Sequence, residues 1–178
     1  MTDTAQRYPL AWPAGWRRTP ALQRQRAQFG TVQRQRMPDG VSRYAGKRRL
    51  SVGDATARLA AELHRLGARD ELLSTNLRLR LDGLPRSDTG EPVDPGAAVY
   101  FRLKGAPRCL ACDRWARVAD NVAALAHHIE ALRAIERYGV GTTEQAFAGY
   151  AALAPSTDEW WLVLGVARAA TLDDVEEA

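Results

Sequence analysis

The sequence predicts an α+β domain in which a small, mainly antiparallel sheet of three strands is covered by two or three helices. Apolar residues step by three and four along residues 51–67 and 114–139, as in amphipathic helices, and alternate along residues 72–83 and 97–104, as in half-buried strands. Charge is the third observation, because residues 1–50 hold 11 Lys and Arg but only two Asp and Glu. We therefore expect a basic arm at residues 1–50, an α+β body at 51–155 and a short helical tail at 156–178.

Composition agrees with a globular chain of one domain. The 178 residues are 46% hydrophobic, which is enough to bury a core. No apolar run approaches the roughly 20 residues of a membrane-spanning helix, and the first residues lack the charged and apolar regions of a secretory signal. Together with only two cysteines, this predicts a cytoplasmic location and no membrane partner.

Residues 7–50 are predicted to form an extended arm. Three prolines and a glycine interrupt residues 7–20, and the aromatic side chains of Tyr8, Trp12 and Trp16 are expected to pin that segment onto the body. A helix is possible over residues 19–30, with Thr19 as its N-cap and Gly30 after its end.

The helix at residues 51–67 has clear boundary signals. Ser51 and Asp54 have the spacing of a capping box, and Gly67 is a typical C-terminal stop. Leu59 and Leu63 lie on one face, which is therefore expected to pack on the sheet.

Three strands are expected next. In the first, residues 72–83, one face holds Leu73, Thr75, Leu77, Leu79 and Leu81. In the second, residues 97–104, Val99, Phe101 and Leu103 point inward. The third strand is short, at residues 107–113, and a long connection rich in turn residues precedes the second.

The strongest helical pattern covers residues 114–139. Its inward stripe comprises Trp115, Val118, Val122, Leu125, Ile129 and Leu132. A shorter helix is expected to begin after Thr142 or Thr143 and to end at Pro155.

The final segment, "WWLVLGVARAATLDDVEEA" from Trp160 to Ala178, resembles the opening of a J domain, the module by which co-chaperones stimulate an Hsp70-type chaperone. The aromatic pair, the "LGV" turn and a Thr-capped acidic helix start follow in the order of that family. The functional His-Pro-Asp loop of the family would lie beyond Ala178. The resemblance therefore implies a partner chaperone only for a longer form of the protein.

The motifs "YPLAWPAGW", "STNLRLRLDGLPRS", "DPGAAVYF" and "CDRWARVADNVAAL" resemble those of small prophage or mobile-element proteins that carry a J domain behind a domain of unknown role. This resemblance implies a co-chaperone-like protein of which the chain contains only the start of the J domain. A role as the client-binding part of such a co-chaperone is one alternative function.

The basic arm predicts contact with nucleic acid or with an acidic or nucleoprotein partner. Arginine suits phosphate oxygens, and the arm intersperses its cations with glutamines and aromatic residues. The candidate binding residues are Arg17, Arg18, Arg24, Arg26, Arg34, Arg36, Arg43, Lys47, Arg48 and Arg49. These residues predict a non-catalytic binding or adaptor protein without a cofactor, and the resemblance described above implies that it belongs to a bacterial mobile element.

Cys109 and Cys112 form a lone C-x-x-C motif. Zinc requires four ligands, and the nearest histidines, His127 and His128, are adjacent on a helix and therefore point in different directions. Thiol redox chemistry is a second possibility, because Cys112 lies just before a helix start, where the helix dipole lowers a thiol pKa. Two ordinary strand cysteines are the preferred interpretation.

Asp113, Asp120 and His127 recur every seven residues and so are expected along the outer stripe of the long helix. The Asp120-Asn121 start resembles that of RusA-type Holliday-junction resolvases, in which clustered aspartates bind magnesium. A metal-dependent nuclease using Asp113 and Asp120 with Asp82 or Asp94 is therefore the enzymatic alternative. A solvated helix face is the preferred interpretation of these residues.

Overall fold

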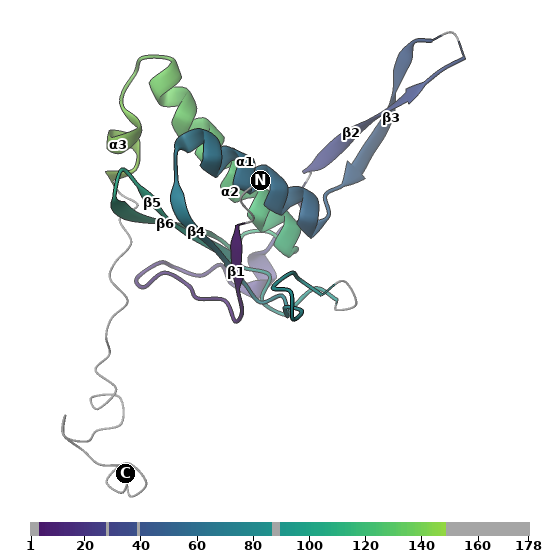
Figure 1. Cartoon of the computed structure of the whole chain (residues 1–178). Helices are drawn as coiled ribbons and strands as arrows, with labels where there is room; N and C mark the ends of the chain where they lie inside the picture. The colour runs from purple at the N-terminus through teal and green to yellow at the C-terminus, as the bar shows by residue number, and fades with distance from the viewer. Residues whose placement is uncertain (1–3, 28, 39, 87–89, 149–178) are drawn as a thin grey trace, which may run out of the picture.

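The computed structural model describes residues 4–27, 29–38, 40–86 and 90–148 (Figure 1). It is an α+β fold with one mixed sheet of four strands, ordered β1-β4-β5-β6, and a separate sheet of two strands, β2 and β3. Within these residues, no helix combines the length and apolarity that a bilayer crossing requires. The J-domain-like segment and the end of the last predicted helix lie outside the described residues.

The larger sheet is antiparallel except at one edge. Its strands are β1 (Ala5–Arg7), β4 (Arg69–Thr75), β5 (Ala97–Leu103) and β6 (Ala106–Cys112). β5 pairs antiparallel with both neighbours, whereas β1 runs parallel to β4, with Ala5 opposite Leu72. The predicted three antiparallel strands are thus present, and the N-terminal strand adds a fourth.

Two long helices lie side by side on one face of this sheet (Figure 1). They are α1 (Val52–Leu66) and α2 (Val118–Arg137), and a short helix, α3 (Thr143–Ala146), follows. The capping box of Ser51 and Asp54 and the left-handed Gly67 confirm the predicted ends of α1. The predicted inward residues of α2 are buried from Val118 onward, whereas Trp115 precedes the helix.

The opposite face of the sheet is covered by the first part of the predicted arm. The Ala11 N–H donates to Ser74 Oγ at 2.7 Å, and the Leu10 N–H donates to Asn76 Oδ1 at 3.0 Å. The Tyr100 hydroxyl on β5 donates to the Ala11 carbonyl at 2.9 Å. Residues 5–24 therefore belong structurally to the body.

The helix expected at residues 19–30 does not form. A single 3-10 turn, η1 (Ala21–Gln23), occupies its start, and β2 (Gly30–Arg36) begins at its end. β2 pairs with β3 (Ser42–Arg49) in a hairpin that projects away from the body (Figure 1). The second half of the arm is therefore a β-hairpin.

The first predicted strand is too long. β4 ends at Thr75, and although Leu73 and Leu77 are buried, Leu81 is fully exposed. The Asn76 side chain accepts from the Leu10 N–H and donates to the Asp94 carbonyl. These bonds tie Asn76 to two loops, so the chain leaves the sheet at this point.

Candidate nucleic-acid interface

The hairpin carries a β-bulge that decides which side chains share a face. Gln33 opposes Gly46 and Arg34 opposes Tyr44, so Ala45 has no partner of its own. Side chains alternate between the two faces of a strand, and a bulge shifts that alternation by one residue. Gly46 has a φ of 122°, which L side chains rarely adopt, and therefore suits the bulge.

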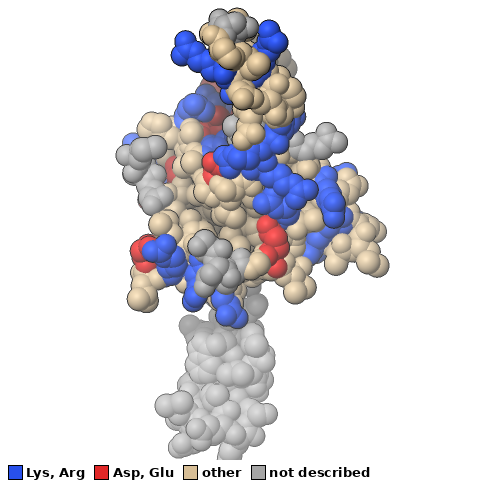
Figure 2. Space-filling model, turned by 90° about the vertical axis from the view of Figure 1, so that its right-hand side faces the viewer, with Lys and Arg blue, Asp and Glu red and all other residues tan. Residues whose placement is uncertain are grey.

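As a result, one face of the hairpin gathers four cations, which we call the basic face: Arg34, Arg36, Lys47 and Arg49. Tyr44 lies among them and is 68% exposed. Figure 2 looks onto the hairpin and shows Lys and Arg side chains along it and on the body surface below it. Both faces of the hairpin are open to solvent, so the basic face is accessible.

None of these four cations has an ion-pair partner among the residues that the structure describes. Arg48, on the other face, differs because its Nη2 lies 2.9 Å from Asp54 Oδ2 at the start of α1. Like charges on a two-stranded ribbon repel each other, and such a ribbon is only marginally stable alone. A polyanion that binds this face would relieve the repulsion.

The first cations of the predicted interface, Arg18 and Arg24, are instead engaged by the body. Arg18 forms an ion pair with Asp94 and a second with Asp113, in which Nε lies 2.8 Å from Oδ2. Arg24 donates to the Val93 carbonyl at 3.0 Å and to Asp94 at 3.2 Å. The charges of Arg18 and Arg24, like that of Arg48, are therefore offset by carboxylates of the same chain, and their contact with a partner stays a prediction.

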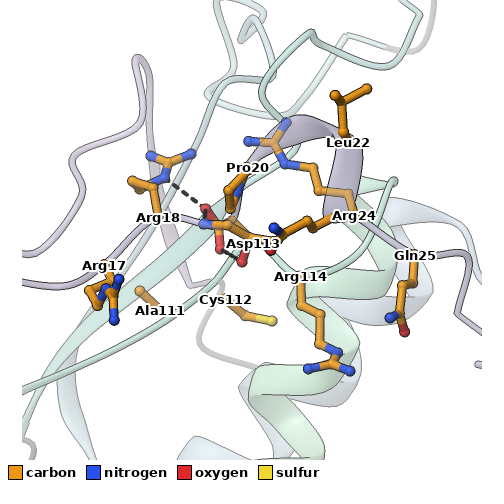
Figure 3. Close-up of a pocket in the computed structure, with 12 residues that line it drawn as sticks. Arg17, Arg18, Pro20, Leu22, Arg24, Gln25, Ala111, Cys112, Asp113 and Arg114 are labelled. Carbon is orange, nitrogen blue, oxygen red and sulfur yellow. Dashed lines mark hydrogen bonds and ion pairs between the residues drawn. The ribbon is translucent and has the colours of Figure 1, made fainter.

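Asp113 lies in the lining of a pocket of about 990 Å³ between the N-terminal segment and the end of β6 (Figure 3). It is 4% exposed and accepts hydrogen bonds from Arg18 Nε, the Thr19 N–H and the Thr19 hydroxyl. Burial raises its pKa, but the bonds from Thr19 and Arg18 outweigh burial and leave the pKa below its usual value. Asp113 thus anchors the N-terminal segment.

Other arginines in this pocket are less constrained. Arg17 is exposed, and Arg114 turns its guanidinium away from Asp113 (Figure 3). Neither has an ion-pair partner among the described residues. Arg17 therefore stays a candidate binding residue, although it lies apart from the hairpin.

The aspartates are not placed as the sequence predicts. Asp113 precedes α2, and Asp113 and Asp120 are both 4% exposed, so neither lies on a solvated helix face. Asp94 and Asp113 do converge, but on Arg18, whereas Asp82 forms an exposed pair with Arg80. The described residues hold no group of three or more His, Cys, Asp or Glu that could bind a metal ion.

The two cysteines lie on β6, three residues apart, so their side chains point to opposite faces of the strand. Cys112 Sγ lies 3.3 Å from Asn121 Oδ1. Burial raises the pKa of both thiols. Cys112 ends β6, and α2 begins only at Val118. A raised thiol pKa favours the interpretation as ordinary strand cysteines over the thiol redox alternative.

Sequence reasoning missed the hairpin, its bulge and the position of Tyr44 among the four cations. A signal was present, because residues 30–36 and 42–49 flank the Asp-Gly dipeptide at residues 39–40, which is typical of hairpin turns. The strands lack an apolar face, however, so the alternation that usually reveals a strand is absent.

Comparison with protein-family models, with curated proteins and with solved structures found no match. Nothing in these comparisons bears on the resemblance to J-domain or mobile-element proteins.

Proposed function

We propose that this chain is a non-catalytic nucleic-acid-binding or adaptor protein whose contact surface is the basic face of the hairpin. The observation that carries the proposal is the gathering of Arg34, Arg36, Lys47 and Arg49 on one exposed face, where none of them forms an ion pair with a described residue. Cations that neutralise phosphates release condensed counterions, and this release drives binding without regard to sequence.

Tyr44 favours nucleic acid over an acidic protein as the partner. Its ring is exposed in the middle of the basic face. Aromatic side chains between cations stack on unpaired bases while the cations hold the backbone, and each stack contributes about 1–3 kcal/mol. An acidic peptide offers carboxylates to the cations but no flat ring to Tyr44.

The core of the test is a salt titration. Binding of a labelled single-stranded oligonucleotide and of its duplex is followed by fluorescence anisotropy between about 50 and 200 mM salt. We expect affinity to fall steeply with salt, and the Arg34→Gln, Arg36→Gln double variant to lower the slope of log K against log salt by about 1.4–1.8, or 0.7–0.9 for each lost contact.

The matched control removes two cations outside the hairpin: Lys104, in the turn between β5 and β6, and Arg137, the last residue of α2. The turn and the end of α2 lie away from the hairpin (Figure 1). The Lys104→Gln, Arg137→Gln variant has the same net charge as the first variant but should keep the wild-type slope. Equal losses in the two variants, or affinity independent of salt, would overturn the proposal. Competition by poly-glutamate as effective as that by unlabelled oligonucleotide would instead identify an acidic protein as the partner.

A further inference from the structure

A smaller pocket lies where the hairpin meets the start of α2. Its volume is about 280 Å³, and its lining includes Phe29, Arg26, Arg49, Arg117 and Asp120. Arg49 is the last residue of β3 and belongs to the basic face, so the pocket opens at the foot of that face. The volume lies just below the usual range of ligand pockets, about 300–1,000 Å³, which suits one small ring system.

Asp120 is the unusual residue of this pocket. It is 4% exposed, yet its carboxylate accepts no hydrogen bond from any described residue. Asp113, equally buried, accepts three. The Asp120 oxygens are not sealed in the interior, and Asp120 lines the pocket, so its carboxylate can accept from a ligand with N–H or O–H donors.

The remaining walls supply an aromatic surface and positive charge. The Phe29 ring is held by edge contact with Trp115, at 5.4 Å between centroids, and by stacking on His127 at 5.3 Å. Arg117 is occupied by Glu91, its Nε lying 3.3 Å from Oε1.

Arg26 and Arg49 have no ion-pair partner in the described part of the chain. Arg49 is close enough to Asp120 to lower the pKa of its carboxyl group. Proteins recognise splayed-out bases by stacking on aromatic rings or guanidinium planes and by hydrogen bonds to the base edges.

We propose that this pocket binds one unpaired nucleobase, with guanine as the preferred base, while Arg26 and Arg49 hold the adjoining phosphate. The two Asp120 oxygens can accept from guanine N1–H and from its exocyclic amino group at once. Adenine and cytosine present one amino group beside a ring nitrogen that is itself an acceptor, and thymine presents one N–H between two carbonyls. In each of these three bases, an acceptor lone pair would face one Asp120 oxygen and repel it.

This inference rests on the proposed function, because it concerns a base in the strand that the basic face holds. The test uses labelled single-stranded pyrimidine oligonucleotides that differ in one central base: guanine, inosine, adenine or cytosine. Inosine keeps N1–H but lacks the amino group. We expect affinity to fall in the order guanine, inosine, adenine, with guanine bound at least about ten-fold more tightly than adenine.

The Asp120→Asn variant should reduce that preference to below about two-fold, because one acceptor becomes an N–H donor that opposes the base. Its salt dependence should stay that of the wild type, since no phosphate contact is lost. A second variant, Ala116→Leu, narrows the pocket without touching Asp120 and should also abolish the preference. Circular dichroism checks that both variants are folded.

The two proposals fail differently. Absence of oligonucleotide binding by the wild type would overturn both of them. Two results would overturn the proposed base binding but not the proposed function of the basic face. One is tight, salt-dependent binding by the wild type without a base preference. The other is a guanine preference that survives in Asp120→Asn and Ala116→Leu. If inorganic phosphate competes with the guanine oligonucleotide as well as guanosine monophosphate does, the pocket is an anion site and the base assignment is wrong.

Discussion

Tyr44 and Lys47 lie on the same face of the β2–β3 hairpin although they are three positions apart in the chain. In a regular strand, residues three apart point to opposite faces. The bulge, in which Ala45 and Gly46 together oppose Gln33, removes that difference. The basic face therefore depends on backbone geometry as well as on the identity of its residues.

A one-residue insertion tests this dependence without changing charge. A threonine placed between Gln33 and Arg34 would give Ala45 a partner and restore regular pairing. Arg34 and Arg36 would then lie on the opposite face from the other two cations. We expect the salt slope of oligonucleotide binding, measured by anisotropy, to fall by about 1.4–1.8.

Deletion of Ala45 is the control for that insertion. It also removes the bulge, but the pairs of Gln33 with Gly46 and of Arg34 with Tyr44 stay as they are. All four cations then remain on one face, and affinity should stay within about two-fold of the wild type. A similar loss in both variants would show that the bulge matters for hairpin stability rather than for the arrangement of charge.

The Asp113 anchor should be important for stability. In Asp113→Ala, Arg18 and the two Thr19 donors lose a nearly buried acceptor. We expect the free energy of unfolding, measured by urea denaturation, to fall by about 2–3 kcal/mol. Glu144→Ala, which breaks only the exposed pair with Lys104, should cost less than about 1 kcal/mol. Equal effects of the two substitutions would contradict the anchoring role.

The two buried aspartates should respond to pH with opposite sign. The pKa of Asp113 is lowered, so its ionised form stabilises the fold above the ordinary pKa of about 3.9, and this stability is lost as pH falls through the lower folded-state value. In Asp113→Asn, the loss of stability relative to the wild type should therefore be largest near neutral pH and shrink in acid. Urea denaturation repeated over a series of pH values measures this difference.

Asp120 behaves in the reverse sense. Burial raises its pKa, Arg117 and Arg49 lower it, and Glu91 adds to the rise, with a net shift upward. Its ionised form therefore costs stability above the folded-state pKa, and that cost disappears as pH falls below the unfolded value. We expect Asp120→Asn to be more stable than the wild type near neutral pH in the same denaturation series, with the gain vanishing in acid. A less stable variant at neutral pH would mean that the carboxylate is satisfied in the free protein.

The cysteines should be poorly reactive in the folded chain. Burial raises the pKa of the Cys109 and Cys112 thiols, and only the thiolate reacts with alkylating reagents. We expect iodoacetamide at neutral pH to modify native protein at least about ten-fold more slowly than protein unfolded in urea, as followed by mass spectrometry. Rapid modification of native Cys112 would restore the redox hypothesis.

The elements that the sequence predicts well are those with local signals. α1 is recognisable because its cap at Ser51, its apolar stripe and its stop at Gly67 all lie within one segment. β1 is not recognisable, because its three residues pair with a strand 67 positions away, as Ala5 does with Leu72. The apparent strand beyond Asn76 shows the converse, since its alternation continues after the sheet has ended.

The candidate sites divide in the same way. Charge along the chain predicts that the N-terminal segment is basic, but not that Arg18 is neutralised by Asp113, 95 positions away. Heptad spacing predicts an exposed Asp120 only if nothing covers the side of the helix that faces away from the sheet. In the structure, Arg26, Ala27, Phe29 and Arg49 line the same pocket as Asp120, which is buried. Burial of a carboxylate is a tertiary property, and no local pattern shows it.

Gly30 pairs with Arg49 at the foot of the hairpin, so the chain returns to almost the place from which it departed. Because its two ends lie together, the hairpin can be lengthened, shortened or replaced while the strands and helices on either side keep their positions. Substitutions in the hairpin can therefore change the surface that it presents to a partner, with little effect on the hydrophobic core.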